Sequence, residues 1–219
     1  MFQILKKWFS SNLETTGDNN IVNYQDFPDC HFKICGDRNQ IIINPTTKLI
    51  GKISIYGDNN LIYIARECNL NVEIDIGRPQ SSFAGPAEKC HLNIGHSVYM
   101  GNAHLVMAEN GSSIRIGDNC TFGAGAQIWA TDMHSMLDEN GQLTNYGHFV
   151  QIGSHVWCGL DVKILKNTQI ASDSVVGAGS IISSKFHEEQ VLIAGNPARI
   201  LKHNIAWNKL TPNRYRERE

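Results

Sequence analysis

His134 is the residue of this sequence whose surroundings best suit a proton acceptor. It stands in residues 132–149, DMHSMLDENGQLTNYGHF, a polar stretch with a DENG turn that predicts a loop. An imidazole titrates near neutral pH and can therefore take a proton from a hydroxyl group. In an extended segment Asp132 would share a face with His134, where its carboxylate could orient the imidazole or hold a hydroxyl. The alternative is an ordinary surface histidine, one of nine, beside a solvated carboxylate.

A repeat of glycine positions predicts the scaffold that must hold this loop. The motif Gly-Asp-x-Asn occurs at 17–20, 36–39 and 57–60, and GDNC occurs at 117–120. With the glycines that follow apolar positions, the series is Gly17, Gly36, Gly57, Gly77, Gly95, Gly117 and Gly153, with spacings of 19, 21, 20, 18, 22 and 36. Because 36 is twice 18, a unit of about 18 to 22 residues recurs along the chain.

A finer period of six appears in the second half. Apolar residues recur at Ile152, Cys158, Ile164, Ile170, Val176 and Ile182, mostly followed by a small residue. Weaker copies pass through Ile94 and Ile116. A period of six fits neither a helix nor a hairpin meander, but it fits a triangular coil of three short strands per turn. The apolar residue of each hexad then points inward, and each coil buries its inner face only against its neighbours.

The sequence therefore predicts an all-β domain, a parallel β-helix over residues 17–198 from which loop 132–149 protrudes. Residues 1–16 are an N-terminal cap or extension, and 199–219 are a C-terminal helix and tail. The apolar spacing in RILKHNIAWNKL predicts a helix over Arg199–Leu210 that caps the open end of the coil. A β-sandwich of many short strands is the alternative fold, although it would not require a six-residue register.

Composition and charge bear on the protein's binding partners and its cellular compartment. The net charge of -2 gives no sign of a protein that binds nucleic acids or a membrane surface. The start, MFQILKKWFSSNLE, lacks a cleavage site of small residues, and no apolar run reaches the length of a membrane span. Six scattered cysteines, with no CxxC pair, are expected to be reduced thiols. We therefore expect a cytoplasmic protein.

Three motifs in this order resemble the hexapeptide-repeat acyltransferase family. They are IWATDMH at 128–134, VQIGSHVWCGLDVKI at 150–164, and VVGAGSII followed by IAGNPARIL at 175–182 and 193–201. The match looks closest to O-acetyltransferases that act on sugars and cell-surface polysaccharides. The resemblance implies a left-handed β-helix, a homotrimer with active sites between subunits, and acetyl-CoA as the acetyl donor, without a metal.

The resemblance also implies roles for individual residues. His134 takes the position of the family's general base, which removes the proton of a sugar hydroxyl as that hydroxyl attacks the thioester directly. The family stabilises the resulting oxyanion with backbone amides near its Trp-x-Gly segment, and this maps to Gly159. Trp157 is expected to pack beside the pantetheine arm or the acceptor, or else to be a bulky corner residue. Asn102 and Tyr99 could face the same cleft as substrate-binding residues.

Coenzyme A is a long thin arm that carries phosphates. The arm should follow a groove between coils, touching backbone at Gly177 and Ala178. Lys185, Arg199 and Lys202 are expected to supply positive charges for the phosphates. Asn196 and Pro197 are expected to shape the turn that closes the adenine end. The stretch KFHEEQVLIAGNPAR departs from the family, which often has a proline-rich turn before its final strand.

Three other functions remain open. A γ-type carbonic anhydrase needs three histidines on zinc, and His91 and His96 resemble its closely spaced pair, with His31 as the upstream candidate. A non-catalytic β-helix could serve as a trimeric binding module. The same chemistry could also N-acetylate an amino sugar.

Overall fold

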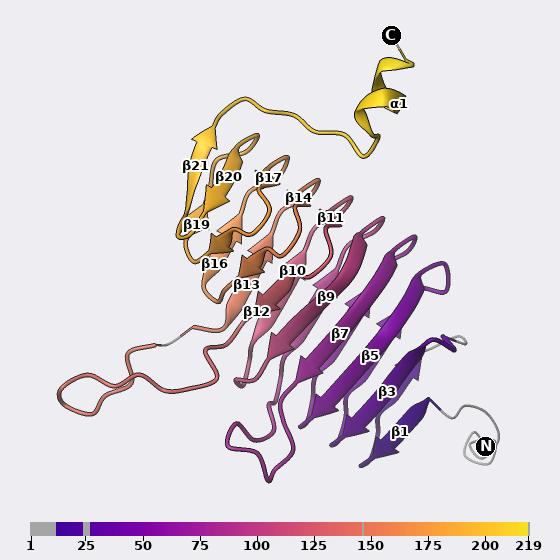
Figure 1. Ribbon diagram of the computed structural model, residues 1–219. Helices are drawn as coiled ribbons and strands as arrows, with labels where there is room; N and C mark the ends of the chain where they lie inside the picture. The colour runs from indigo at the N-terminus through magenta and orange to yellow at the C-terminus, as the bar shows by residue number, and fades with distance from the viewer. Residues whose placement is uncertain (1–11, 24–26, 146, 219) are drawn as a thin grey trace.

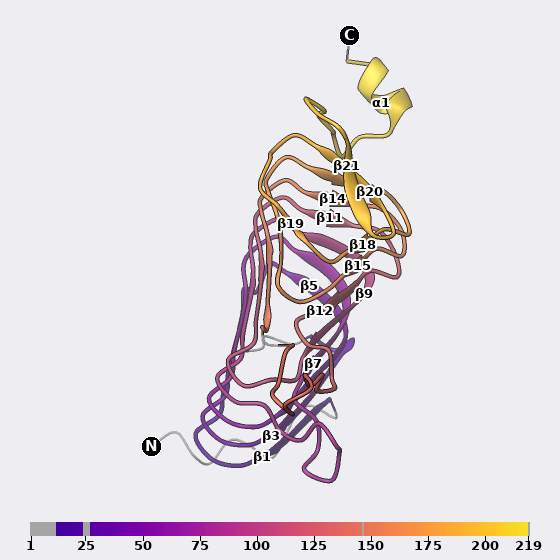
Figure 2. The same cartoon turned by 90° about the vertical axis from the view of Figure 1, so that its left-hand side faces the viewer.

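The computed structural model describes residues 12–23, 27–145 and 147–218, and these form a left-handed parallel β-helix, as expected. Successive coils stack side by side with their strands in parallel register (Figure 1). Seen from the side, the coils follow one another from the N-terminal to the C-terminal end of the prism (Figure 2). Each coil crosses three faces, so side chains that are about twenty residues apart in sequence become neighbours in adjacent coils.

The strands form two sheets. The eight-stranded sheet, which we call the third face, has the order β19-β16-β13-β10-β8-β6-β4-β2. Its strands are β2 (Ile21–Asn23), β4 (Gln40–Ile43), β6 (Leu61–Ile64), β8 (His91–Ile94), β10 (Ser113–Ile116), β13 (Phe149–Ile152), β16 (Thr168–Ile170) and β19 (Lys185–Phe186).

The thirteen-stranded sheet bends around the other two faces. Its early strands are β1 (Leu13–Thr16), β3 (Cys30–Cys35), β5 (Lys48–Tyr56), β7 (Asn69–Ile76) and β9 (Tyr99–Met107). In the early coils one long strand runs across both faces, whereas in the later coils each face has a short strand of its own. The first face has β11 (Thr121–Phe122), β14 (Trp157–Cys158), β17 (Val175–Val176), β20 (Leu192–Gly195) and β21 (Ala198–Lys202). The second face has β12 (Gln127–Trp129), β15 (Lys163–Ile164) and β18 (Ile181–Ile182). Strand β9 begins on the first face and ends on the second, because it pairs with β11 at one end and with β12 at the other.

The hexad register defines the core. All six predicted positions are at most 2% exposed, and they lie on the three faces of two consecutive coils: Ile152, Cys158, Ile164, Ile170, Val176 and Ile182. A second buried residue follows four positions after most of them, at Val156, Val162, Thr168, Ser174 and Ser180. Each face and its corner thus take six residues, which is why the period is six rather than two. The six cysteines are free thiols, five of them buried, in agreement with the expected reduced state.

The repeated Gly-Asp-x-Asn motif forms a corner held by side-chain ladders. Asn39 is fully buried, and its side-chain oxygen accepts hydrogen bonds from the backbone and side-chain nitrogens of Asn60, both at 3.0 Å. The Asp58 carboxylate in the same way accepts the backbone N–H of Asp37 at 2.8 Å. Gly36 has a φ of 138°, and an added Cβ would lie 2.1 Å from the Gly57 carbonyl oxygen. The glycine is therefore required by the close approach of the next coil.

Two excursions leave the prism at the corner between the second and third faces. The first connects β7 to β8 through residues 77–90. The second is the predicted loop, which leaves after β12, returns at β13, and projects from the body of the molecule (Figure 1). Its tip is closed by a β-bridge between Leu137 and Leu143. The two excursions leave from the same corner of two coils that are separated only by the coil of β9, and they meet where Phe83 stacks on His134.

The helix predicted over Arg199–Leu210 is wrong. Residues Ala198–Lys202 are strand β21, which pairs antiparallel with β20 after the turn at Asn196–Pro197. The edge of the last parallel coil offers unpaired backbone groups, and a returning strand satisfies them in a way that a helix could not. A short helix, α1 (Pro212–Arg216), follows only later and begins at a proline.

At the other end, β1 already pairs with β3, so the coil starts before Gly17. Residues 1–11 of the predicted N-terminal cap lie outside the described residues. The described part of the chain contains no helix with the length and apolar character needed to cross a lipid bilayer.

Candidate active site

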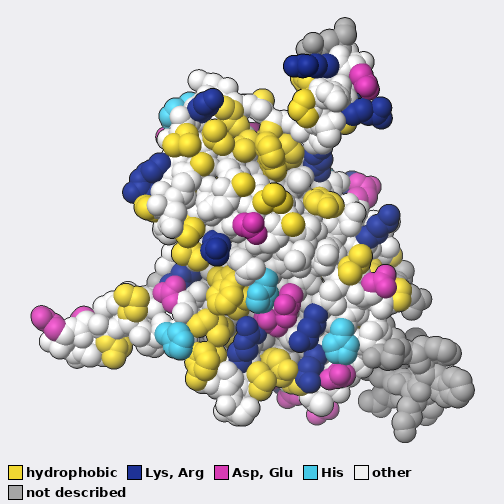
Figure 3. All heavy atoms as spheres, in the orientation of Figure 1, with side chains coloured by type: hydrophobic (Ala, Val, Ile, Leu, Met, Phe, Trp, Pro, Cys, Tyr) yellow, Lys and Arg dark blue, Asp and Glu magenta, His cyan; other side chains and the backbone are white. Residues whose placement is uncertain are grey.

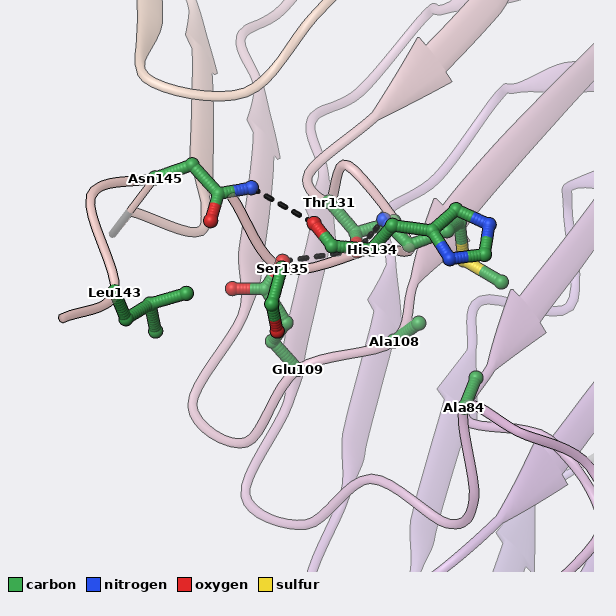
Figure 4. Close-up of a pocket in the computed structure, with 9 residues that line it drawn as sticks. Ala84, Ala108, Glu109, Thr131, His134, Ser135, Leu143 and Asn145 are labelled. Atoms are coloured by element: carbon green, nitrogen blue, oxygen red, sulfur yellow. Dashed lines mark hydrogen bonds between the residues drawn. The ribbon is translucent and has the colours of Figure 1, made fainter. Parts of the chain in front are cut away.

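His134 lines a pocket at the corner between the second and third faces. The pocket is formed by both excursions and by the corner after β9, with Ala84, Ala108, Glu109, Thr131, Met133, His134, Ser135, Leu143 and Asn145. In Figure 4, Leu143 and Asn145 lie on one side of the His134 backbone, and the imidazole extends to the other side, towards Ala84. The side chain is exposed, so a substrate can reach it.

The imidazole of His134 is oriented by an aromatic stack rather than by a carboxylate. Its ring lies parallel to that of Phe83, with 4.9 Å between centroids and 6° between planes. Phe83 is 75% exposed and comes from the excursion between β7 and β8. Among the described residues, neither imidazole nitrogen of His134 has a hydrogen-bond partner, so a nitrogen remains available to a substrate hydroxyl.

Asp132 holds the loop instead of the imidazole. Its carboxylate pairs with the ammonium of Lys166 at 2.9 Å and accepts a hydrogen bond from Asn145 Nδ2 at 2.9 Å. The same Asn145 amide donates to the carbonyl oxygen of His134 at 2.8 Å, and Lys166 also donates to the Asn145 carbonyl. The Lys166 side chain is only 8% exposed. The buried ammonium thus connects the loop to the coil beneath it.

The residues immediately before His134 adopt a tight turn. Met133 has a φ of 63°, a left-handed conformation that costs a non-glycine residue about 1–2 kcal/mol. Its N–H donates to Thr131 Oγ1 at 2.9 Å, and the Thr131 hydroxyl donates to Glu109 Oε1 at 2.9 Å. This chain of hydrogen bonds stabilises the strained turn and directs the His134 side chain out of the prism.

Trp157 and Tyr99 lie elsewhere, on the first face. Trp157 and Thr121 are paired in register, and Thr121 is paired in turn with Tyr99. Trp157 is 43% exposed and Tyr99 is 46% exposed. Neither Trp157 nor Tyr99 lines the pocket of His134, which lies at the corner between the second and third faces. A single chain therefore brings Trp157 and Tyr99 into one row and separates both from His134.

The Gly159 amide, predicted to bind an oxyanion, already has an acceptor within the coil. Its N–H donates to the Val176 carbonyl at 2.8 Å and is therefore occupied within the coil. An added Cβ would lie 2.7 Å from the backbone nitrogen of Ala178, so the glycine is needed for the contact between coils and not for a ligand. The next amide, that of exposed Leu160, has no hydrogen-bond acceptor among the described residues.

The residues predicted to bind coenzyme A fall into separate groups. Gly177 and Ala178 form the corner that follows β17, one coil above Gly159. Lys185 is on the third face, with its ammonium 5.2 Å from the centre of the Phe149 ring. Arg199 and Lys202 are on β21.

Two further predicted ligand contacts are corner residues. Asn196 and Pro197 are exposed in the turn between β20 and β21. Asn102 stands at the corner within β9 with a φ of 62°, and it is not among the residues that line the pocket of His134.

A zinc site of three histidines is not present in the described part of the chain. His31 is on β3, His91 opens β8 in the other sheet, and His96 pairs with Asp118 at 3.1 Å. A different group, Glu73, Asp75 and His104, has its ligand atoms within 4.8 Å of one another.

Two members of that second group, Asp75 and His104, already belong to an ion network with Arg78. Asp75 Oδ2 contacts His104 Nε2 at 3.0 Å and Arg78 at 3.1 Å. Burial raises the pKa of Asp75, but the hydrogen bond from His104 and the charge of Arg78 outweigh it, so the pKa lies below its usual value. In Figure 3, histidines and charges of both signs gather over β1 to β9, where this network and the pair of Glu14 with Lys33 lie.

Sequence reasoning missed the residues that position His134. Phe83, Glu109, Asn145 and Lys166 come from four successive coils and share no motif. Their separations in sequence from His134 carry no periodic signal. The excess of glycine, serine and proline in RPQSSFAGP at 78–86 would have indicated a second loop.

Comparison with known proteins identifies the relatives of this chain. No family model matches it. It is 35% identical over 190 residues to the polysialic acid O-acetyltransferase of Neisseria meningitidis, covering 80% of this chain and 87% of that protein. Among solved structures, the polysialic acid O-acetyltransferase OatWY superposes with a TM-score of 0.75 at 30% identity, covering 90% of this chain and 93% of the other.

A second solved structure, that of the polySia-specific acetyltransferase NeuO, has a TM-score of 0.79 at 24% identity over 90% and 88% of the two chains, and supports the fold alone. The chain therefore belongs to the hexapeptide-repeat acyltransferases, among the O-acetyltransferases of sugars and polysaccharides.

Proposed function

We propose that this enzyme transfers an acetyl group from acetyl-CoA to a hydroxyl of a sugar or polysaccharide, with His134 as the general base. Relatives named polysialic acid O-acetyltransferases support the acceptor class and make polysialic acid the first acceptor to test. The observation that carries the assignment is the accessible imidazole of His134, which is stacked on Phe83 and has no hydrogen-bond partner at its nitrogens among the described residues. The free cysteines fit a cytoplasmic enzyme.

The reaction needs a single proton acceptor. His134 removes the proton of the acceptor hydroxyl while the hydroxyl oxygen bonds to the thioester carbonyl carbon. The tetrahedral intermediate then collapses, the carbon–sulfur bond breaks, and the imidazolium returns the proton to the leaving thiolate. The direct transfer needs no acyl-enzyme. The buried thiols are unsuited to form one, since burial raises the pKa of Cys120, for example, to about 12.

The oxyanion needs a donor other than Gly159. The amide of Leu160 is the nearest candidate in the same corner, since its N–H is free of backbone acceptors and its residue is exposed. The free amide of Ala178, one coil above, would meet the pantetheine arm. Arg199 and Lys202 would then meet the phosphates, whereas Lys185 would first have to leave the Phe149 ring.

The two halves of this site come from neighbouring subunits of a homotrimer. His134 is at the corner between the second and third faces, and Trp157 is on the first face. Packing the prisms around a threefold axis would set the corner of one subunit against the first face of the next. Asp132 acts as a positioning residue through Lys166 and Asn145.

The test is thiol release from acetyl-CoA in the presence of polysialic acid and a panel of other glycans and amino sugars. We expect His134→Ala to lower kcat by about two to four orders of magnitude. His148→Ala, which removes an exposed histidine from the base of the same loop, should leave kcat unchanged. Full activity of His134→Ala would refute the mechanism. Turnover of amino sugars alone would replace O-acetylation by N-acetylation.

A further inference from the structure

The chain after β21 is held against the side of the coil as a strap, which we define as residues 203–211. Three hydrogen bonds fix it. The N–H of Ile205 donates to the Gln190 carbonyl at 2.9 Å, Trp207 Nε1 donates to the His155 carbonyl at 2.8 Å, and Lys209 Nζ donates to the Ser97 carbonyl at 3.0 Å. The acceptors belong to every second corner between the third and first faces, namely the corners after β19, β13 and β8. Figure 1 shows this segment leading from β21 to α1.

The strap places an indole ring next to Trp157. Trp207 lies parallel to the imidazole of His155, with 4.4 Å between ring centroids and 13° between planes. The imidazole is itself held by Asp173, at 2.8 Å. On the other side, the rings of Trp207 and Trp157 are 6.0 Å apart and inclined by 40°. The two indoles therefore lie next to each other, and we call this pair, Trp157 and Trp207, the aromatic notch.

The notch continues into a row of side chains on the first face. Trp157, Thr121 and Tyr99 lie in register on adjacent strands, so the row crosses two strand spacings, about 10 Å. The hydroxyl oxygen of Thr121 is covered by its neighbours and has no hydrogen-bond partner within the described ranges. Lys209 donates once to Ser97, and an ammonium has three donors, so two remain.

We propose that this surface, with Trp207 as its principal residue, binds the pyranose rings next to the one being acetylated, and so selects a glycan chain over a single sugar. The proposal rests on the proposed function. Apolar C–H faces of sugar rings pack on indoles by dispersion, and the polar groups at the edge supply hydrogen bonds to hydroxyl or carboxylate oxygens. A single ammonium on an aromatic surface suits such rings better than it suits the phosphates of coenzyme A.

The direct test compares Trp207→Ala with wild type in two assays. In the kinetic assay we expect the KM for polysialic acid to rise about tenfold, as for the loss of one stacked ring. The KM for acetyl-CoA, and the KM for a monosaccharide acceptor, should not change. In the second assay, calorimetric titration with polysialic acid in the absence of acetyl-CoA should show the same tenfold weakening of Kd.

Two further variants separate stacking from structure. Trp207→Phe keeps an aromatic face but loses the Nε1–H donor, and should recover most of the affinity. Tyr215→Ala removes an exposed aromatic ring from α1, beyond the strap, and should match wild type in every measurement.

The outcomes distinguish this proposal from the proposed function. If wild type acetylates polysialic acid and Trp207→Ala has an unchanged KM and Kd, the notch is not a glycan site, whereas the enzyme assignment stands. Equal increases in the KM for glycan and for acetyl-CoA would make the strap merely structural. If no glycan is acetylated but polysialic acid binds wild type more tightly than Trp207→Ala, the notch stands and the catalytic proposal fails. Absence of both binding and turnover overturns both.

Discussion

Lys166 offers the sharpest test of how the loop of His134 is held. Its ammonium is buried beneath the loop and contacts the Asp132 carboxylate at 2.9 Å as well as the Asn145 carbonyl. Lys166→Met would keep the buried aliphatic stem and remove only the charge and its donors. Asp132 would then lose its cationic partner, and the segment that carries His134 would lose its connection to the coil.

The magnitude follows from the exposure of the two partners. Breaking a fully buried ion pair costs about 3–5 kcal/mol, and an exposed pair contributes about 0.2–1 kcal/mol. The Lys166 side chain is 8% exposed and that of Asp132 is 38% exposed, so we expect about 2 kcal/mol, between these limits. If this energy serves only to hold His134 in its productive position, kcat falls about 30-fold.

Three measurements check this prediction. Thiol release gives kcat, urea unfolding gives the global free energy of unfolding, and chymotrypsin reports opening of the loop, whose Leu137 and Leu143 are exposed. We expect a lower kcat and faster cleavage within residues 132–148. Lys163→Met removes an exposed lysine from the adjacent strand β15 and should change neither quantity.

A specific result would refute the reasoning. If Lys166→Met retains the wild-type kcat and the wild-type cleavage rate, the buried pair does not position His134. If kcat falls, adding Asp132→Asn should cost little more, because the two residues act as one pair. Full additivity of the two changes would mean that Asp132 acts by another route, such as direct contact with the acceptor.

Further predictions concern the scaffold. Gly159→Ala places a Cβ 2.7 Å from the Ala178 nitrogen and should lower the free energy of unfolding by about 1–3 kcal/mol, read from the urea midpoint; an unchanged midpoint would contradict the packing role. Burial raises the pKa of Asp75, but the hydrogen bond with His104 and the charge of Arg78 together outweigh burial, so the pKa lies below its usual value. A lowered carboxyl pKa stabilises the fold above the unfolded pKa of about 3.9, and that contribution disappears as the pH falls through the folded value. Asp75→Asn should therefore flatten the loss of stability below about pH 4, and an unaltered acid profile would argue against this. Native protein should react quickly with a disulfide reagent at Cys35 alone, the one cysteine that is not buried, and rapid labelling of several thiols would contradict the core assignment.

The period of six was enough to predict the coil. Each hexad carries one inward apolar residue, and this local rule repeats without reference to distant residues, so Ile152 through Ile182 could be placed in the core from the chain alone. The end of the coil could not be predicted in this way. Apolar spacing over Arg199–Leu210 is compatible with a helix, but an unpaired strand edge next to it favours β21.

The sequence alone determined the scaffold, the protruding loop and the identity of His134 as the candidate base, because a repeat and a short motif are both local properties. Only the tertiary structure decided what surrounds that base. Phe83 and Lys166 reach it from other coils, across 51 and 32 residues of sequence. The Gly159 N–H donates a hydrogen bond to a backbone carbonyl of the next coil. Trp157 and Trp207 come into contact away from the corner that carries His134. Stacking of coils turns sequence distance into contact, and no local pattern specifies which outward side chains then meet.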